Sequence, residues 1–480
     1  MKQEYFLSQR LGFTNNQADK IKAMGVEKFV QASFKTSFET TVPDFLADAP
    51  KSIAEYKELR KMSEDEKKAL AVKERLRNVG NGYWWLNKMN EDEYPLREKL
   101  VLFWHNHFVS GYPKVKSSWA LFQQNQLFRE HAFGNFKELT KLILYNNAMI
   151  SYLDNNNNKA KAPNENLSRE LLELFTLGVG NYTEGDIKEG ARALAGLGMG
   201  EEKGRYYRVQ EDNSDKVYMG KKGNWKADDI VDIIFQQPKA AHRLSEKLLK
   251  YFMMDMPLNP TEKQKALIDE YAAHFKQNNY EIKPFIEKLV KDPRFLNSQG
   301  QKIKDPLTFL LQAHSEFQLD LPQAKRIVPY FQSQGMVLFS PPNVKGWDGG
   351  KTWLSSQKLV QRIGIIAVLG SGQNLEAFAF KKPKMEEKML EGDTMNGDIP
   401  MRRNQKNAVK PNIKWDKSLK NNKDIIKNLT DRLVFNVNKD MQEDMERILK
   451  YDFNPAEMNA DQAVTRLAEY IMKAPEFQIY

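Results

Sequence analysis

The chain has 480 residues, of which 41% are hydrophobic and 28% are charged, so it can bury a large core and exceeds the length at which one core usually stops growing. It contains no cysteine, which excludes disulfides, thiolate metal sites and iron–sulfur clusters. The formal net charge is +10, and residues 381–420 carry half of it, with eleven Lys/Arg against six Asp/Glu. Because no basic groove with interleaved aromatic residues accompanies this segment, we expect no nucleic-acid partner.

Helical periodicity predominates from the first residues onward. Ser63 and Glu66 have the spacing of a capping box, Thr183 is a second N-cap with Asp186 in the first turn after it, and the apolar stripe of 93–108 predicts a buried helix. Further helices are expected at 226–236, 239–254, 261–278, 305–317, 322–336, 353–370, 421–437 and 461–473. The strongest strand signal is 204–219, where two alternating arms flank the turn-prone DNSD. The fold class predicted is mainly α, a multi-helix orthogonal array with one small β-hairpin near 204–219.

Composition divides the chain into three parts. Residues 1–380 are expected to form the main helical body, with the hairpin as an insertion. Residues 381–420 mix Lys, Asn, Met, Pro and Gly without a period, which predicts a basic, flexible loop or linker. Residues 421–480 are expected to form a C-terminal helical cap that packs on the body.

No apolar run reaches the roughly 18 residues that a membrane span needs, so we expect no transmembrane segment. The opening MKQEYFLSQRLGF also lacks the apolar core of a signal peptide. A cytoplasmic protein and an exported protein whose signal is missing from this sequence both stay open at this point.

The segment 164–178, NENLSRELLELFTLG, predicts an amphipathic helix. At about 100° per residue, Glu165, Arg169 and Glu173 fall on one face. The opposite face is apolar and carries Leu167, Leu171, Leu174 and Phe175. The polar residues form either a ladder on a solvated surface or the wall of a cleft, in which Arg169 orients two carboxylates for acid–base work. Periodicity alone favours the solvated ladder.

Two of the six histidines lie in the string Trp104-His-Asn-His-Phe108, at the end of an apolar helix. Residues two apart on a helix point about 200° from each other, so His105 and His107 cannot both ligate one metal while the helix continues. We expect one histidine to be buried and structural and the other to face a cleft. No spacing supplies the further ligands of a zinc site, so we predict no bound metal.

The segment 340–353, SPPNVKGWDGGKTW, predicts a tight loop that contains three glycines, two prolines and two tryptophans. Trp347 either offers a flat face to a sugar ring or plugs the core, and the composition does not decide between these interpretations. The loop lacks the GxxxxGK[ST] order of a phosphate loop. No GxSxG elbow, HExxH, EF-hand loop or dinucleotide fingerprint occurs in the chain, so we predict no cofactor.

Four stretches, taken in this order, resemble the bacterial family DUF1800. They are FWHNHF at 103–108, AMISYLDN at 148–155, NENLSRELLELFTLGVGNYTEGD at 164–186 and PPNVKGWDGGKTW at 341–353. The likeness extends from the opening RLGF to the closing APEFQIY and so covers nearly the whole chain. It implies an exported helical protein, periplasmic or extracellular, with a secreted partner of sulfatase-like fold encoded nearby, but it brings no assigned activity.

The resemblance also changes the interpretation of 164–178. Because the polar stripe belongs to a motif of the family, a cleft or a buried ion network becomes the preferred interpretation over a solvated ladder. A buried network of this kind is compatible with a purely structural role.

Two functions remain in competition, and the sequence leaves open whether the protein is an enzyme. The first is a hydrolase or lyase acting on a cell-envelope polymer such as a glycan. Its expected catalytic residues are Glu165, Arg169, Glu173 and His107, and its expected substrate-binding residues are Trp347, Asn343, Lys345, Asn164 and Glu170. The second is a non-enzymatic binding or assembly protein that works with a secreted partner. It requires Glu165 and Arg169 to be paired and sealed from water.

Overall fold

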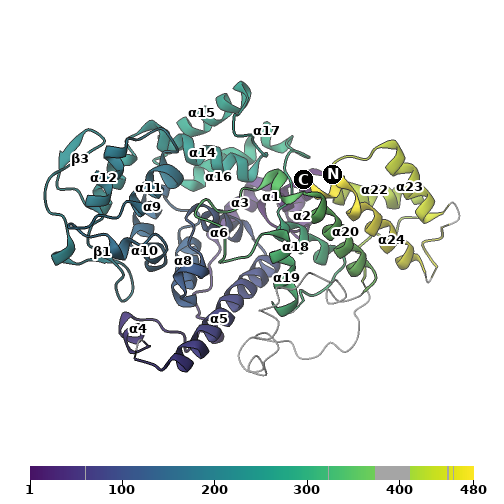
Figure 1. Cartoon of the computed structure of the whole chain (residues 1–480). Coiled ribbons are helices and arrows are strands. Elements are labelled where there is room, and N and C mark those ends of the chain that lie inside the picture. Colours follow the sequence, from purple (N-terminus) through teal and green to yellow (C-terminus); the bar gives the residue numbers. More distant parts are fainter. Residues whose placement is uncertain (60, 323, 373–410, 451–452, 458) are drawn as a thin grey trace.

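The computed structural model describes residues 1–59, 61–322, 324–372, 411–450, 453–457 and 459–480, and most of them are helical (Figure 1). The first elements are α1 (Gln3–Leu11), α2 (Ala18–Met24), α3 (Val26–Lys35), η1 (Asp44–Leu46), α4 (Ile53–Leu59), α5 (Glu64–Glu91), α6 (Leu96–His107), α7 (Tyr112–Val115), α8 (Ser118–Glu130), α9 (Phe136–Leu144), α10 (Asn147–Tyr152) and η2 (Asn155–Asn157). The mainly α fold class is confirmed.

The middle of the chain contains α11 (Asn166–Glu170), the π-helical η3 (Leu171–Thr176), α12 (Glu184–Ala193), β1 (Leu197–Gly198), β2 (Arg205–Tyr206), η4 (Arg208–Gln210), β3 (Lys216–Tyr218), β4 (Lys221–Gly223), α13 (Ala227–Ile234), α14 (Pro238–Phe252), α15 (Glu262–Gln277), α16 (Ile282–Lys291) and α17 (Pro293–Leu296). The remaining elements are α18 (Pro306–Glu316), α19 (Ala324–Gln334), η5 (Gly350–Trp353), α20 (Ser356–Gly370), α22 (Asn422–Leu433), α23 (Lys439–Leu449), α24 (Ala460–Lys473) and η8 (Pro475–Gln478).

Helix starts follow the capping chemistry of the sequence. The Ser63 hydroxyl accepts from the backbone N–H of Glu66, and the Glu66 carboxylate accepts in return from the N–H of Ser63. Thr183 and Asp186 form the same reciprocal pair at the start of α12. From its capping box α5 runs as a helix of 28 residues, with α4 beside its outer end (Figure 1).

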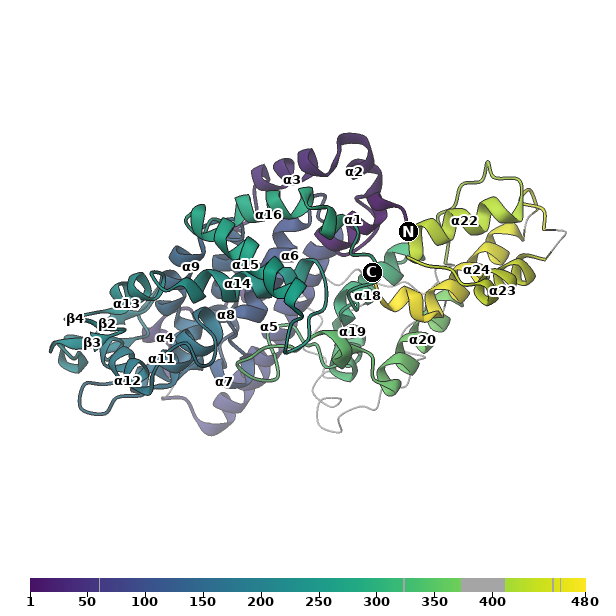
Figure 2. The ribbon, with the colours of Figure 1, turned by 90° about the horizontal axis from the view of Figure 1, so that it is seen from above.

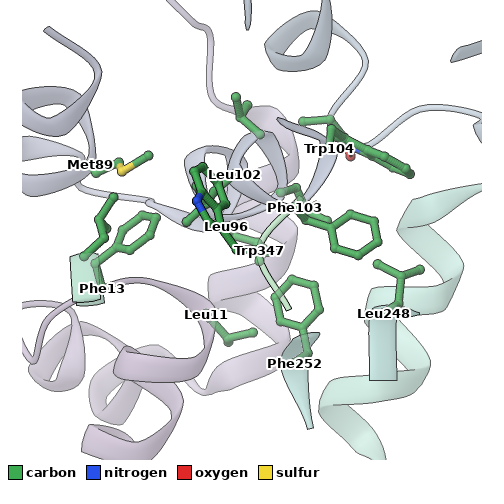
Figure 3. Close-up of a cluster of buried hydrophobic side chains, with 14 of the residues drawn as sticks. Leu11, Phe13, Met89, Leu96, Leu102, Phe103, Trp104, Leu248, Phe252 and Trp347 are labelled. Carbon is green, nitrogen blue, oxygen red and sulfur yellow. Dashed lines mark hydrogen bonds between the residues drawn. The ribbon is translucent and has the colours of Figure 1, made fainter. Parts of the chain in front are cut away.

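Helix α6 occupies the centre of the main group of helices, against α3, α5 and α8 (Figure 2). All of its residues except Asn106 are buried, as expected for a helix that neighbours enclose on every side. Its aromatic residues pack into the principal core together with side chains from α1, α5 and α14, as Figure 3 shows for Leu102, Phe103, Trp104 and Leu248. The end of α6 is therefore held inside the protein.

A buried ion pair fixes α6 to its neighbours. Glu98 accepts from the Arg129 guanidinium at 2.6 and 2.8 Å and from Trp85 Nε1 at 2.7 Å. Both charged side chains are almost fully buried, and their polar atoms satisfy one another. The three residues lie on α6, α8 and α5, so this network sets how the three helices meet.

The β structure is small, as expected, but its pairing differs in detail from one hairpin across 204–219. β1 pairs with β2, and β3 pairs with β4, both antiparallel. The β3–β4 turn consists of Met219 and Gly220, which have φ of 47° and 79°, the positive values that a two-residue hairpin turn needs. The DNSD segment instead docks on α12, where Arg192 Nε donates to Asp212 at 2.8 Å.

The last helices lie beside the main body at one side of the molecule (Figure 2). α24 packs against α20, α22 and α23. After α24 the chain returns to residues 302–304, where the N–H of Lys304 donates to Gln478 O and the N–H of Tyr480 donates to Lys302 O, each at 2.9 Å. Of the predicted basic loop, residues 381–410 lie outside the described residues, and the domain division stays a prediction.

Candidate functional site

Three consecutive residues at the end of α6 bind three partners on two distant segments, the loop 339–347 and α14. His105 Nε2 accepts from the N–H of Phe339 at 3.2 Å, and Asn106 Oδ1 accepts from the N–H of Trp347 at 2.7 Å. His107 Nδ1 lies 3.1 Å from Lys247 Nζ on α14. Successive residues of a helix point about 100° apart, which explains why neighbours in the sequence serve different partners. The Trp104–Phe108 motif is therefore a joint between segments that are far apart in the chain.

Both histidines of this motif are buried, with exposed fractions of 1% for His105 and 3% for His107. Burial lowers the pKa of His105 to about 3 and holds the pKa of His107 well below its ordinary value, where the charges of Lys247 and Arg243 act in the same direction. Both rings are therefore neutral near pH 7. The expectation that one of them faces a cleft is wrong, because core side chains surround each ring.

The loop that follows Ser340 folds against the end of α6. Trp347 is 7% exposed, and its ring lies 5.8 Å from the ring of His105. Its flat face is therefore covered, and the interpretation of Trp347 as an open stacking platform is wrong. Asn343 and Lys345 remain exposed, and Asn343 Oδ1 accepts from the N–H of Lys345 at 2.9 Å, which tightens the turn between them.

The helix predicted over 164–178 changes its geometry after Glu170. From Leu171 to Thr176 it is a π-helix, in which the N–H of Leu177 donates to Leu172 O, five residues back, at 2.9 Å. The wider turn shifts later side chains from the angles of a uniform helix, and Thr176 lies in the core. Lys247 Nζ donates to Leu174 O at 2.8 Å, which satisfies a carbonyl near the helix end.

The polar stripe of this helix faces solvent in part. Arg169 donates to Glu165 at 3.1 Å and to both carboxylate oxygens of Glu184 on α12, at 2.9 and 3.0 Å. The Arg169 and Glu165 side chains are 35% and 37% exposed, so the pair exists but is not sealed from water. Glu165 itself precedes α11 as its N-cap residue, and Asn164 Oδ1 accepts from the N–H of Asn166 at 3.0 Å.

Glu170 and Glu173 are three residues apart on the same partly buried side of this helix. Burial raises the pKa of Glu170, the charge of Glu173 raises it further, and the charges of Arg169 and Lys345 oppose this shift. Glu173 accepts from the hydroxyl of Tyr182 at 2.9 Å. Burial and this hydrogen bond raise the pKa of Tyr182 to about 12, so the phenol keeps its proton.

Tyr152 completes this group of side chains. Its pKa is raised by burial first and then by the charge of Glu170. We use the term carboxylate face for Glu170, Glu173, Tyr152, Tyr182 and Lys345. The face thus combines two carboxyl groups, two phenols and one exposed ammonium group, and three of the motif segments contribute to it.

The structure brings together only part of the predicted site. The charges of Glu173 and Lys345 both act on the pKa of Glu170, whereas His107 forms no ion pair with any carboxylate in the described ranges. Sequence reasoning missed five residues, which are Asn106, Tyr152, Tyr182, Glu184 and Lys247. Four of these residues lie within the motif strings and only Lys247 lies outside them, so the polar residues of the strings themselves were the available signal.

Over the part of the chain that the structure describes, no group of three or more His, Asp or Glu side chains has the arrangement of a metal site. In the same residues no helix has both the length and the apolar character that crossing a membrane requires.

The geometry defines a mainly α protein in which three distant motif segments meet at the end of one buried helix. The chain belongs to the family described as "Protein of unknown function (DUF1800)", whose model matches residues 7–479. The match covers nearly the whole chain and confirms the resemblance of the motif strings. No curated protein and no solved structure matches the chain.

Proposed function

We propose that the carboxylate face is the proton-transfer site of a hydrolase or lyase that acts on a cell-envelope polymer such as a glycan. Glu170 is the general acid, Glu173 is the general base, and Tyr182 orients the Glu173 carboxylate. The envelope setting, whether periplasmic or extracellular, and a secreted partner of sulfatase-like fold rest on the family resemblance alone.

One observation carries this proposal, namely that two neighbouring carboxyl groups have different environments. Glu170 is partly buried and holds its proton to a higher pH than an ordinary glutamate, while Glu173 accepts from a phenol that stays protonated. A carboxyl group that holds its proton beside a carboxylate that accepts a hydrogen bond can divide the roles of acid and base with it. The charges of Lys345 and Arg169 act on Glu170 and can balance charge that develops on a substrate.

The test is a screen of purified envelope polymers, with release of reducing ends as the readout for hydrolysis and of unsaturated ends for a lyase. For a polymer that the wild type cleaves, E170Q and E173Q should each lower kcat by about 10²-fold or more. E262Q is the matched control, since Glu262 lies on α15 with a 90% exposed side chain. Full activity of E170Q with unchanged melting would rule out the acid role.

The second candidate is a binding or assembly protein without chemistry. It is favoured by the internal use of His105, Asn106 and Trp347, which hold segments together. Calorimetric titration of the same polymers separates the candidates. A polymer that binds wild type and E170Q equally tightly, and that neither protein cleaves, would favour binding alone.

A further inference from the structure

The loop from Phe339 to Trp347 is fastened to the end of α6 at both of its ends. At its start, the N–H of Phe339 donates to His105 Nε2 at 3.2 Å, and Phe339 O accepts from the N–H of Tyr112 at 2.8 Å. At its other end, Trp347 binds Asn106 through both backbone groups. The turn around Lys345 therefore has little freedom to move relative to α6.

Asn106 makes the closer of these attachments. Its Oδ1 accepts from the N–H of Trp347 at 2.7 Å, and its Nδ2 donates to Trp347 O at 3.3 Å. The backbone of Gly346 passes so near that a Cβ at this position would lie 2.2 Å from Asn106 Oδ1. The side chain of Asn106 thus bonds both backbone groups of Trp347, as a neighbouring strand would. It leaves room at position 346 only for a residue without a Cβ.

Lys345 lies between this clamp and the turn that Asn343 closes. The N–H of Lys345 donates to Asn343 Oδ1 at 2.9 Å, so its backbone is held on both sides. Pro341, at the start of the same turn, and Tyr152 of the carboxylate face both approach Gly111, within 3.7 and 3.5 Å of a Cβ placed there. The start of the loop therefore lies near Tyr152, and the charge of Lys345 acts on Glu170.

We propose that Asn106 is a positioning residue of the carboxylate face, because its clamp on Trp347 holds the loop that carries Lys345 on the side of Glu170. A catalytic role for Asn106 depends on the proposed function. Asn106 does not touch the carboxylates and acts on them only through the loop. The charge of Lys345 on this loop is what acts on Glu170.

The experiment is a titration of the Glu170 carboxyl group by NMR on the whole chain with ¹³C-labelled glutamate, in which E170Q assigns the signal. The positive charge of Lys345 lowers the pKa of Glu170, so K345M should titrate at higher pH than the wild type, and K345R should restore the wild-type value. Leucine has as many side-chain heavy atoms as asparagine but cannot form its hydrogen bonds. N106L should therefore shift the pKa of Glu170 in the same direction as K345M. K188M removes an exposed charge that acts on Glu184 and should leave Glu170 unchanged.

If folded N106L gives Glu170 the same pKa as in the wild type, the positioning role of Asn106 is overturned. If K345M gives the wild-type pKa, the role of Lys345 is overturned, and this second test does not require N106L to fold. The titration needs no substrate, which separates this inference from the proposed function. If the titrations shift but no polymer is cleaved, the positioning role of Asn106 is supported and the proposed hydrolase or lyase activity is rejected. If cleavage depends on Glu170 but the pKa of Glu170 in N106L equals that of the wild type, the enzymatic activity is supported and the positioning role is rejected.

Discussion

The imidazole of His107 lies against the ammonium group of Lys247, with 3.1 Å between Nδ1 and Nζ. The same ammonium group donates to Leu174 O at 2.8 Å, so Lys247 on α14 joins the end of α6 to the π-helical turn. Both of these acceptors are neutral, so the contact places a cation between two uncharged groups. The stability of the protein must then depend on the charge of this group.

Stability should therefore rise with pH in the mildly alkaline range. Burial lowers the pKa of Lys247 to about 7 from an ordinary 10.5, so between these values the unfolded chain binds more protons than the folded chain. The free energy of unfolding in urea should accordingly be larger at about pH 9 than at about pH 7, and the increase should be smaller in K247M. Lys99 has a pKa lowered to about 7 by burial as well, so K99M should reduce the same increase. If the free energy of unfolding rises equally in K247M and in the wild type, the folded protein does not disfavour the protonated form of Lys247.

Removal of the charge of Glu98 should be strongly destabilising. E98Q leaves the buried Arg129 guanidinium beside a neutral partner, and breaking a buried pair in this way costs about 3–5 kcal/mol. Equilibrium unfolding in urea measures the loss. E130Q is the control on the same helix as Arg129, since Glu130 is exposed and should change stability by less than about 0.5 kcal/mol. Equal effects of the two substitutions would contradict the buried network.

R169A should have a small effect on stability. Its partners are exposed, and surface ion pairs contribute about 0–1 kcal/mol. A shift of no more than about 1 kcal/mol in urea unfolding is expected, with K265A, from the exposed Glu262 pair, as the comparison. A loss near that of E98Q would show that the Arg169 ion pairs are a structural clasp.

The clamp on Trp347 should make Gly346 the most sensitive glycine of its loop. G346A places a Cβ 2.2 Å from Asn106 Oδ1 at a φ of 80°, whereas the same change at Gly349, with φ of 74°, meets only Trp353 Nε1 at 3.8 Å. Both variants bear the cost of a positive φ, about 1 kcal/mol, and only G346A adds the clash. Thermal melting should fall further for G346A, together with a change in tryptophan fluorescence as Trp347 becomes exposed. Equal melting temperatures would contradict a tight fit.

Much of the fold followed from local signals. Apolar stripes and caps predicted α13, α14, α15, α18, α20 and α24 to within a few residues, because an amphipathic helix carries its period in its own sequence. Several helices lie outside the predicted segments, among them α16 and α23, although the apolar residues Met441, Met445 and Leu449 of α23 have helical spacing. The hairpin turn was misplaced because Met219 is not a typical residue for a positive φ.

The site could be predicted only in part. Glu173 was expected beside Glu165 and Arg169 because a regular period determines neighbours on a helix, and Glu170 was expected among the substrate-binding residues. The covered ring of Trp347, the Lys247 contact and the Asn106 clamp each depend on residues at least 73 positions apart, and periodicity carries no information about such pairs. The π-turn was missed because the expected angles assumed a uniform helix.

The three attachments at the end of α6 make the rotational phase of that helix critical. One extra residue inserted between Leu96 and Phe103 would turn His105, Asn106 and His107 together by about 100°, and the loop of Trp347 and the helix of Lys247 would lose their partners in one step. The same insertion near Lys67, where α5 is exposed, would turn only solvated side chains. Changes in chain length should therefore be tolerated along the outer part of α5 and rejected within α6, however conservative the inserted residue.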